Sequence, residues 1–252
     1  LGWCTGSLCA QEKSFLWQVE GKNRVYILGS IHLLKKTDGP LKPIIDETFA
    51  KAKRVVFEVD LLNDGSEKMQ QLVLKRGINL DGKTLQQKIS PETLQLATVW
   101  ANDLGIDIKM LSPFKPWVAG MTMIVMQLQK LGYDPNLGVD RLLAERAKQA
   151  NKPVSGLESG EFQIELLDGL PASLQEMMLR QSFAEMSQFD KSVDSMVRAW
   201  RGGDVGAAEK LFLESMTEYP ALREKPLDER NRNWLPQGEK YLSLGDGGSV
   251  GG

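Results

Sequence analysis

Histidine and cysteine are nearly absent from this chain. Among 252 residues there is one histidine, His32, and there are two cysteines, Cys4 and Cys9. Two thiols cannot form a zinc cluster by themselves, and thiols this close together make a poor structural disulfide. A serine–histidine–acid triad would have to use His32, and Ser30, two residues away, is poorly placed as its nucleophile.

Several patterns that define function are also missing. The sequence has no glycine-rich loop of the P-loop type, no G-x-S-x-G elbow and no H-E-x-x-H helix. A net charge of −2 and an aromatic content of 7% give no indication of a nucleic-acid partner or a membrane surface. The longest charge-free apolar segment, Pro116 to Gln129, is shorter than the roughly 20 residues that a membrane helix needs. We therefore predict a globular chain without a transmembrane segment.

One stretch near the N-terminus predicts a strand–helix–strand unit. Val25–Leu28 and Val55–Phe57 are short apolar runs rich in strand-forming residues, and residues 41–52 between them carry apolar side chains at helical spacing. The strands of such a unit run parallel in one sheet, and functional groups collect at their carboxyl ends. His32 follows the first strand and Glu58 follows the second. We expect these two side chains to lie close together.

The remaining patterns predict an α/β (α+β-like) fold with a central, mostly parallel sheet. Phe15–Glu20 and Lys22–Leu28 predict an N-terminal hairpin, Ile106–Leu111 a short strand, and Pro153–Glu158 a third parallel strand. Residues 160–241 show only helical periodicity, which predicts a large helical cap on the sheet.

The two ends of the chain differ in composition from the rest. Small and apolar residues up to Ala10, followed by a polar stretch, are typical of the tail of a secretory signal, which favours a periplasmic or extracellular protein. We expect residues 1–14 to be a signal remnant or a disordered end, and 15–252 to form one domain. Residues 245–252 are glycine-rich and would suit a turn before another strand, so we expect a truncated C-terminus.

Four carboxylates are candidates for chemistry. Glu58 closes a strand that should be buried, so it needs a cation, a metal or hydrogen bonds. Asp60 lies two residues on and has a turn or capping role as its alternative. Glu158 repeats the pattern at the third strand, where its alternative is to support the cap of the next helix. Asp140 opens a helix, where the helix dipole alone favours an acid.

The segment from Arg230 to Trp234 (RNRNW) is more basic than a surface helix needs. Arg230 and Arg232 are suited to hold a substrate carboxylate or to pair with the clustered acids, and an exposed basic turn is the alternative. One imidazole with two or three carboxylates is a chemically reasonable site for a divalent ion that activates water.

Five motifs occur in order along the chain: GSIH, FEVD, KPWVAG, GVDRLLAERAKQANKPVSGLES and ERNRNW. Together, from Phe15 to Tyr241, they resemble the TraB/GumN family, whose relatives include the Tiki-type metalloproteases. The family pattern has two G-x-x-H motifs and a glutamate, thought to bind a divalent metal for hydrolysis. The first motif matches Gly29–His32 and the glutamate matches Glu58. The second motif has no counterpart, since no histidine follows His32.

The resemblance implies a metal-dependent hydrolase, a peptidase acting on extracytoplasmic peptides, with its cleft at the strand carboxyl ends. His32 and Glu58 would bind manganese, cobalt or zinc, and Glu58 would ligate the ion or activate water. Glu158 would support the site, while Arg230 and Asn231 would orient a peptide or small-molecule substrate or stabilise an oxyanion. The missing second motif favours an alternative, a non-catalytic protein that sequesters a peptide, a metal or haem. A structural helical partner protein is a third interpretation.

Overall fold

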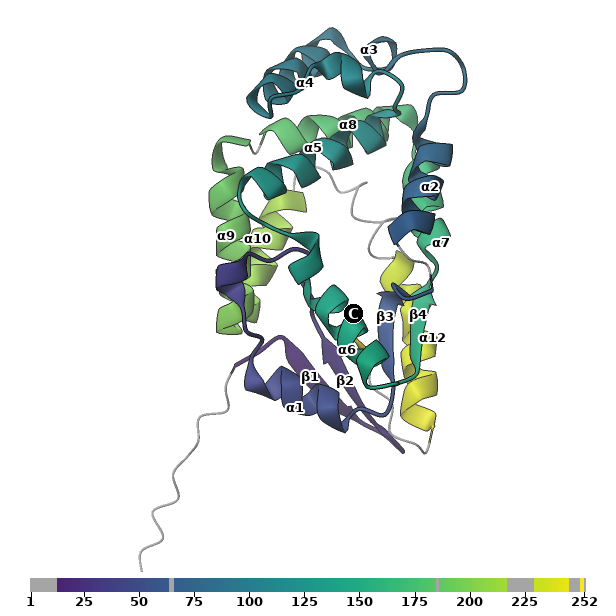
Figure 1. Ribbon diagram of the computed structural model, residues 1–252, viewed down its shortest axis with the longest axis vertical. Helices are drawn as coiled ribbons and strands as arrows, with labels where there is room; N and C mark the ends of the chain where they lie inside the picture. Colours follow the sequence, from purple (N-terminus) through teal and green to yellow (C-terminus); the bar gives the residue numbers. More distant parts are fainter. Residues whose placement is uncertain (1–12, 64–65, 185, 217–228, 245–249, 252) are drawn as a thin grey trace, which may run out of the picture.

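Short strands gather at one end of the molecule, and helices extend from them to the other (Figure 1). The computed structural model describes residues 13–63, 66–184, 186–216, 229–244 and 250–251. The strands are β1 (Leu16–Glu20), β2 (Arg24–Leu28), β3 (Val55–Val59), β4 (Val154–Glu158) and β5 (Val250–Gly251). The α-helices are α1 (Pro43–Lys51), α2 (Ser66–Gly77), α3 (Leu85–Lys88), α4 (Pro91–Asp103), α5 (Pro116–Lys130), α6 (Val139–Gln149), α7 (Gly160–Asp168), α8 (Ala172–Ala184), α9 (Met186–Gly202), α10 (Val205–Met216) and α12 (Arg230–Ser243). Short 3₁₀ helices are η1 (Lys36–Asp38), η2 (Ile108–Leu111) and η3 (Pro135–Leu137).

The N-terminal hairpin has the antiparallel pairing that the sequence predicts. β1 pairs with β2, with Leu16 opposite Leu28 and Glu20 opposite Arg24. The turn is tied to α12 because the side chain of Asn23 is buried and donates a hydrogen bond to the carbonyl of Tyr241 (3.1 Å). The hairpin therefore holds α12 against the strands.

Parallel pairing is confirmed for β3 with β4, but β2 and β3, the two strands of the predicted strand–helix–strand unit, lie in different sheets among the described residues. β5 pairs parallel with β2, and β3 pairs parallel with β4, with Val59 opposite Glu158. β5 lies against β3 as well as β2. Within the described residues, however, the two-residue β5 forms ladder bonds with β2 alone, so the strands do not join into the single sheet that we predicted. The fold is of the α+β class, and the ends of β2, β3 and β4 still face one region.

The larger part of the core lies between β2, β3, α1, α6 and α9. Helix α6 presents apolar side chains at helical spacing, and α9 contributes Val197 and Trp200. The indole nitrogen of Trp200 donates a 2.7 Å hydrogen bond to the carbonyl of Gly29, just beyond β2. Helix α9 is thereby anchored at the loop that carries His32.

A second core lies away from the strands, between α3, α4, α5 and α8 (Figure 1). Trp100, Met123 and Leu179 are fully buried there. Helix α8 packs on α5 rather than on the strands. Among the described helices of the predicted cap, α9 and α12 reach the strands, and α7 packs against α2.

The predicted strand at Ile106–Leu111 is wrong. Gly105, with φ of 77°, ends α4, and the carboxylate of Asp107 then accepts a hydrogen bond from the backbone N–H of Lys109 (2.9 Å). This local capping starts η2 at Ile108 and satisfies the backbone without a neighbouring strand.

Two expectations concern the membrane and the ends of the chain. Among the described residues, no helix is long and apolar enough to cross a bilayer. The predicted signal remnant and the glycine-rich turn fall largely on residues 1–12 and 245–249, which lie outside the described residues. The strand β5 begins at Val250.

Candidate functional site

His32 lies in the loop after β2, where the N-terminus of α6 meets the backbone of that loop. The N–H of Val139 donates to the carbonyl of Ile31 (2.9 Å), which fixes the start of α6 beside His32. The approach is so close that a Cβ atom at Gly138 would overlap the carbonyl group of His32. A glycine immediately before α6 is therefore what allows its first turn to reach the histidine.

Asp140, in that first turn, faces His32. Its Oδ1 lies 3.1 Å from His32 Nδ1, and the two side chains are 20% and 60% exposed. Asp140 Oδ1 is buried, and within the described part of the chain His32 Nδ1 is the polar atom that faces it. The pKa of His32 is raised, mainly by its pairing with Asp140 and further by the charge of Glu58. Burial of the ring and the charge of Arg230 act in the opposite direction and lower this pKa.

His32 and Asp140 line a cavity of about 230 Å³ at the strand ends. Ser30, Glu58 and Gln163 supply its other polar walls. The apolar walls are Leu28, Phe57, Val59, Leu61 and Leu143. The histidine after β2 and the glutamate of β3 therefore face the same small cavity, as the strand–helix–strand pattern predicts.

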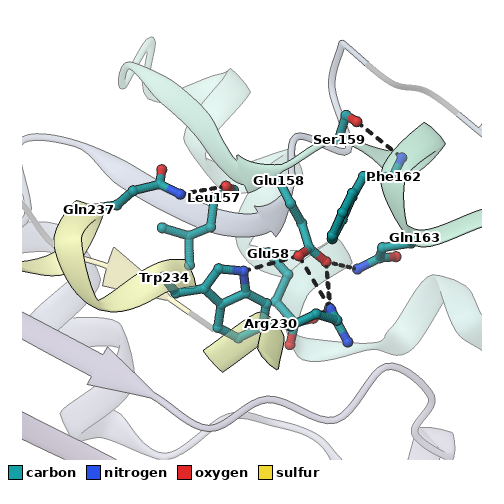
Figure 2. Close-up of polar contacts among 9 residues, drawn as sticks. All are labelled: Glu58, Leu157, Glu158, Ser159, Phe162, Gln163, Arg230, Trp234 and Gln237. Carbon is teal, nitrogen blue, oxygen red and sulfur yellow. Dashed lines mark hydrogen bonds and ion pairs between the residues drawn. The ribbon is translucent and has the colours of Figure 1, made fainter. Parts of the chain in front are cut away.

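Arg230, at the start of α12, joins the ends of β3 and β4 (Figure 2). Its Nη2 lies 2.7 Å from Glu58 Oε2 and 2.5 Å from Glu158 Oε1, and its Nε donates to Glu158 Oε1 at 2.9 Å. The three side chains are mostly buried, at 14%, 26% and 7% exposed for Arg230, Glu58 and Glu158. One guanidinium thus supplies the cation for both carboxylates.

Two further side chains complete the surroundings of Glu158. The indole N–H of Trp234 donates to Glu158 Oε2 (3.1 Å), and Gln163 donates to Oε1 (2.7 Å) (Figure 2). The guanidinium of Arg230 also lies 5.0 Å from the centre of the Trp234 ring, a cation–π distance. Burial opposes the charge of Arg230, but the bonds to Glu158 and the charge of Glu58 outweigh it and raise its pKa.

The structure places the predicted site residues in two groups. His32 and Glu58 line the cavity, and Glu158 and Arg230 form the ion cluster that holds Glu58. Asn231 is exposed and lines a different cavity, on the side of α12 that faces the hairpin. The sequence left open whether Arg230 pairs with the clustered acids or lies in an exposed basic turn, and its position favours the pairing.

Two other candidates have local roles. Asp60 accepts hydrogen bonds from the backbone N–H groups of Leu62 and Asn63, which is the turn role given as its alternative. Arg232 is exposed.

The sequence reasoning underrated Asp140 and missed Gln163 and Trp234. A first-turn aspartate is expected from the helix dipole, and Asp140 indeed lies in the first turn of α6. The signal that distinguishes it is Gly138, because a glycine before a helix N-terminus permits close approach to another backbone. Gln163 lies one turn into α7, and nothing in its local sequence identifies it.

A divalent ion would need more donors than the described residues bring together. His32 and Asp140 carry two suitable donor groups, but Asp140 Oδ1 already faces His32 Nδ1 at 3.1 Å. Glu58, the predicted second ligand, is bound by Arg230, whose charge also opposes a cation at the same oxygen. Within the described ranges, no three histidine, cysteine, aspartate or glutamate side chains are placed to share an ion. These residues therefore do not fit a complete metal centre.

The chain thus has an α+β fold, and polar side chains line a cavity at the carboxyl ends of its strands. The sequence profile of the TraB/PrgY/gumN family matches residues 15–250. The chain belongs to the TraB/PrgY/gumN family, which confirms the resemblance found in the motifs.

Curated relatives are uncharacterized proteins. The chain is 30% identical over 152 residues to YbaP of Escherichia coli (strain K12) and equally to YbaP of Shigella flexneri, covering 60% of this chain and 54% of each relative. It is 25% identical over 218 residues to a protein of Treponema pallidum (strain Nichols), covering 82% of this chain and 63% of that protein. The chain thus spans little more than half of YbaP. No solved structure matches it significantly.

Proposed function

We propose that the chain is a hydrolase that acts on peptides and that the reaction takes place in the cavity lined by His32, Glu58 and Asp140. The observation that carries the proposal is the pairing of His32 with Asp140 at the wall of an open cavity. An imidazole whose pKa is raised by a neighbouring carboxylate is suited to accept a proton from water and to return it to a leaving amine.

The chain's own residues have distinct tasks in this proposal. Asp140 faces Nδ1 of His32 and favours the proton on that nitrogen. The other ring nitrogen, Nε2, is then free to act as the general base. Arg230 binds Glu58 and Glu158 together, so it holds the Glu58 wall of the cavity in place. Glu158 and Trp234 hold Arg230 in place. Extracytoplasmic peptides are the proposed substrates because the motifs resemble those of metalloproteases that act there.

The same experiment tests whether cleavage requires a divalent metal. Purified protein is incubated with an unbiased peptide mixture with and without added Mn²⁺, Co²⁺ or Zn²⁺, and products are identified by mass spectrometry. We expect cleavage by the wild type and slower cleavage by Glu58→Gln. Glu47→Gln, which alters an exposed glutamate of α1, is the matched control and should cleave normally. Peptide binding without metal and without any cleavage would overturn the hydrolase proposal.

A non-catalytic binding protein is the second candidate, and one observation favours it. Both glutamates at the strand ends are already paired with Arg230, so neither is poised to act on water. This candidate predicts that peptide, metal or haem binds with measurable affinity and is released unchanged, and that Glu58→Gln alters the affinity without creating or removing any product.

A further inference from the structure

A second cavity of about 530 Å³ lies between the N-terminal hairpin and α12. Side chains such as Trp17 and Ile27 of the hairpin and Trp234 and Leu235 of α12 make its walls almost wholly apolar, and Asn231 and Glu239 are its polar lining residues. Three of these side chains are exposed (Trp17 43%, Ile27 42% and Leu235 65%), so the cavity opens to solvent. Its volume and composition are those of a small-molecule site, which is typically mostly apolar and about 300–1,000 Å³.

The cavity is long because it follows one face of α12. The lining positions Asn231, Trp234, Gly238 and Leu242 recur every three or four residues. Eleven residues of helix separate the first from the last, which corresponds to roughly 16 Å at about 1.5 Å per residue.

Gly238 keeps this cavity open at a cost to the helix. A Cβ atom added at Gly238 would meet no atom within 4 Å, so packing does not require glycine there. Glycine inside a helix is less favourable than alanine by roughly 0.5–1 kcal/mol. Because Gly238 lines the cavity and has no side chain, it leaves room at the centre of the cavity.

The cavity adjoins the ion cluster through Trp234. The same indole that lines the cavity donates to Glu158 and lies against Arg230. Asn231, the residue after Arg230, supplies an uncharged polar side chain at this end. Glu239, the charged lining residue, lies roughly two helical turns further along α12, so the uncharged polar end of the cavity is the end nearest the candidate site.

The apolar walls also indicate what fits inside. A peptide backbone would bury N–H and C=O groups with almost no partners on these walls, which is costly. An aliphatic chain has no such groups. We propose that this cavity binds an unbranched aliphatic acyl chain with its polar end at Asn231. Resting on the proposed function, the inference is that substrates of the hydrolase carry such a chain.

The test uses saturated fatty acids of eight, ten and twelve carbons, kept below their micelle concentrations. Binding is followed by calorimetry and by the change in tryptophan fluorescence, to which Trp17 and Trp234 contribute as lining residues. Because one buried methylene is worth about 0.8 kcal/mol, we expect the affinity to rise up to about fourfold per added methylene. Gly238→Leu fills the cavity and should weaken binding at least about tenfold, while the midpoint of unfolding stays or rises.

Gly206→Leu is the matched control, because it adds the same side chain to an exposed glycine of α10, where a Cβ atom meets only the side chain of Asp204 at an ordinary contact distance of 3.8 Å. It should leave fatty-acid binding unchanged. Equal affinity in the wild type and Gly238→Leu, no dependence on chain length, or a dimer that blocks binding would each overturn the inference.

The hydrolase proposal is separated from this inference by a third variant. His32→Gln should bind the fatty acids as the wild type does, because His32 does not line this cavity. If neither protein cleaves any peptide and both bind the chains, the hydrolase proposal fails and the acyl-chain site stands. If the wild type cleaves peptides but binds no fatty acid, the acyl-chain site fails alone.

Discussion

Arg230 and Glu58 are 172 residues apart in the chain and are joined by a 2.7 Å ion pair between mostly buried side chains. The same guanidinium binds Glu158, so the first residue of α12 closes the ends of β3 and β4 together. Any change that moves α12 must therefore also change the charge around the cavity that holds His32.

Replacing Arg230 with methionine should destabilise the fold. The change leaves two carboxylates near each other without their cation, and we expect a loss of about 2–4 kcal/mol in the free energy of unfolding. Urea denaturation measures it. Combining Arg230→Met with Glu158→Gln in a double-mutant cycle should recover part of the loss, because one of the stranded charges is then gone. Strictly additive losses would show that the ion cluster does not act as a unit.

Asp140→Asn should lower the pKa of His32. Asp140 is the main cause that raises this pKa above the ordinary value of 6.5, and asparagine removes its charge. Because His32 is the only histidine, its ring protons give a single, directly assignable titration curve by NMR. Asp103→Asn, at an exposed aspartate of α4, is the control and should leave the curve in place. An unchanged pKa in Asp140→Asn would refute the pairing.

The pairing of His32 with Asp140 should stabilise the fold more at low pH than at high pH. The pKa of His32 is raised in the folded state, so the folded protein holds the proton more tightly than the unfolded chain. The stabilisation is therefore fully present below about pH 6.5 and is lost as the pH rises through the folded pKa. The stability advantage of the wild type over Asp140→Asn should be larger at about pH 5.5 than at about pH 8.5. The opposite slope would contradict the assignment.

Gly138→Ala should displace the loop that carries His32. The added methyl group overlaps the backbone of His32, so either the loop or the start of α6 must move. We expect a loss of at least about 2 kcal/mol in the free energy of unfolding and a shift of the His32 resonances. Gly206→Ala, in α10, adds the same group where it meets only the side chain of Asp204, at an ordinary contact distance of 3.8 Å, and should be neutral or stabilising. Equal behaviour of the two variants would show that the close approach is unimportant.

Trp200→Phe tests the anchor between α9 and the end of β2. The change removes the hydrogen bond to the carbonyl of Gly29 and leaves that acceptor partly buried. We expect a loss of about 1–3 kcal/mol, measured by urea denaturation, from the unpaired carbonyl and the smaller ring. His32 lies three residues beyond Gly29, so its NMR signal should also shift. A stable variant with an unchanged signal would show that α9 does not position the loop.

The sequence could predict the strand ends because the signals there are local. The hairpin and the parallel pairing of β3 with β4 follow from apolar periodicity, and His32 and Glu58 face one cavity although β2 and β3 lie in different sheets. The same reasoning failed at Ile106–Leu111, where a capping aspartate satisfied the backbone without a partner strand.

The polar contacts around Glu158 could not be predicted in the same way. Arg230, Trp234 and Gln163 converge on it from helices α12 and α7. Periodicity shows that a helix has an apolar face, but it does not say which strand end that helix reaches. The choice between an exposed basic turn and an ion pair at Arg230 thus needed the tertiary structure.

The most direct test of the account is peptide hydrolysis by His32→Gln beside the wild type. Glutamine keeps a polar side chain in the cavity but cannot act as a general base near neutral pH. The account predicts that the cleavage rate falls at least about 100-fold while the far-ultraviolet circular dichroism and the unfolding midpoint stay close to those of the wild type. Cleavage at the wild-type rate by a folded His32→Gln protein would contradict it.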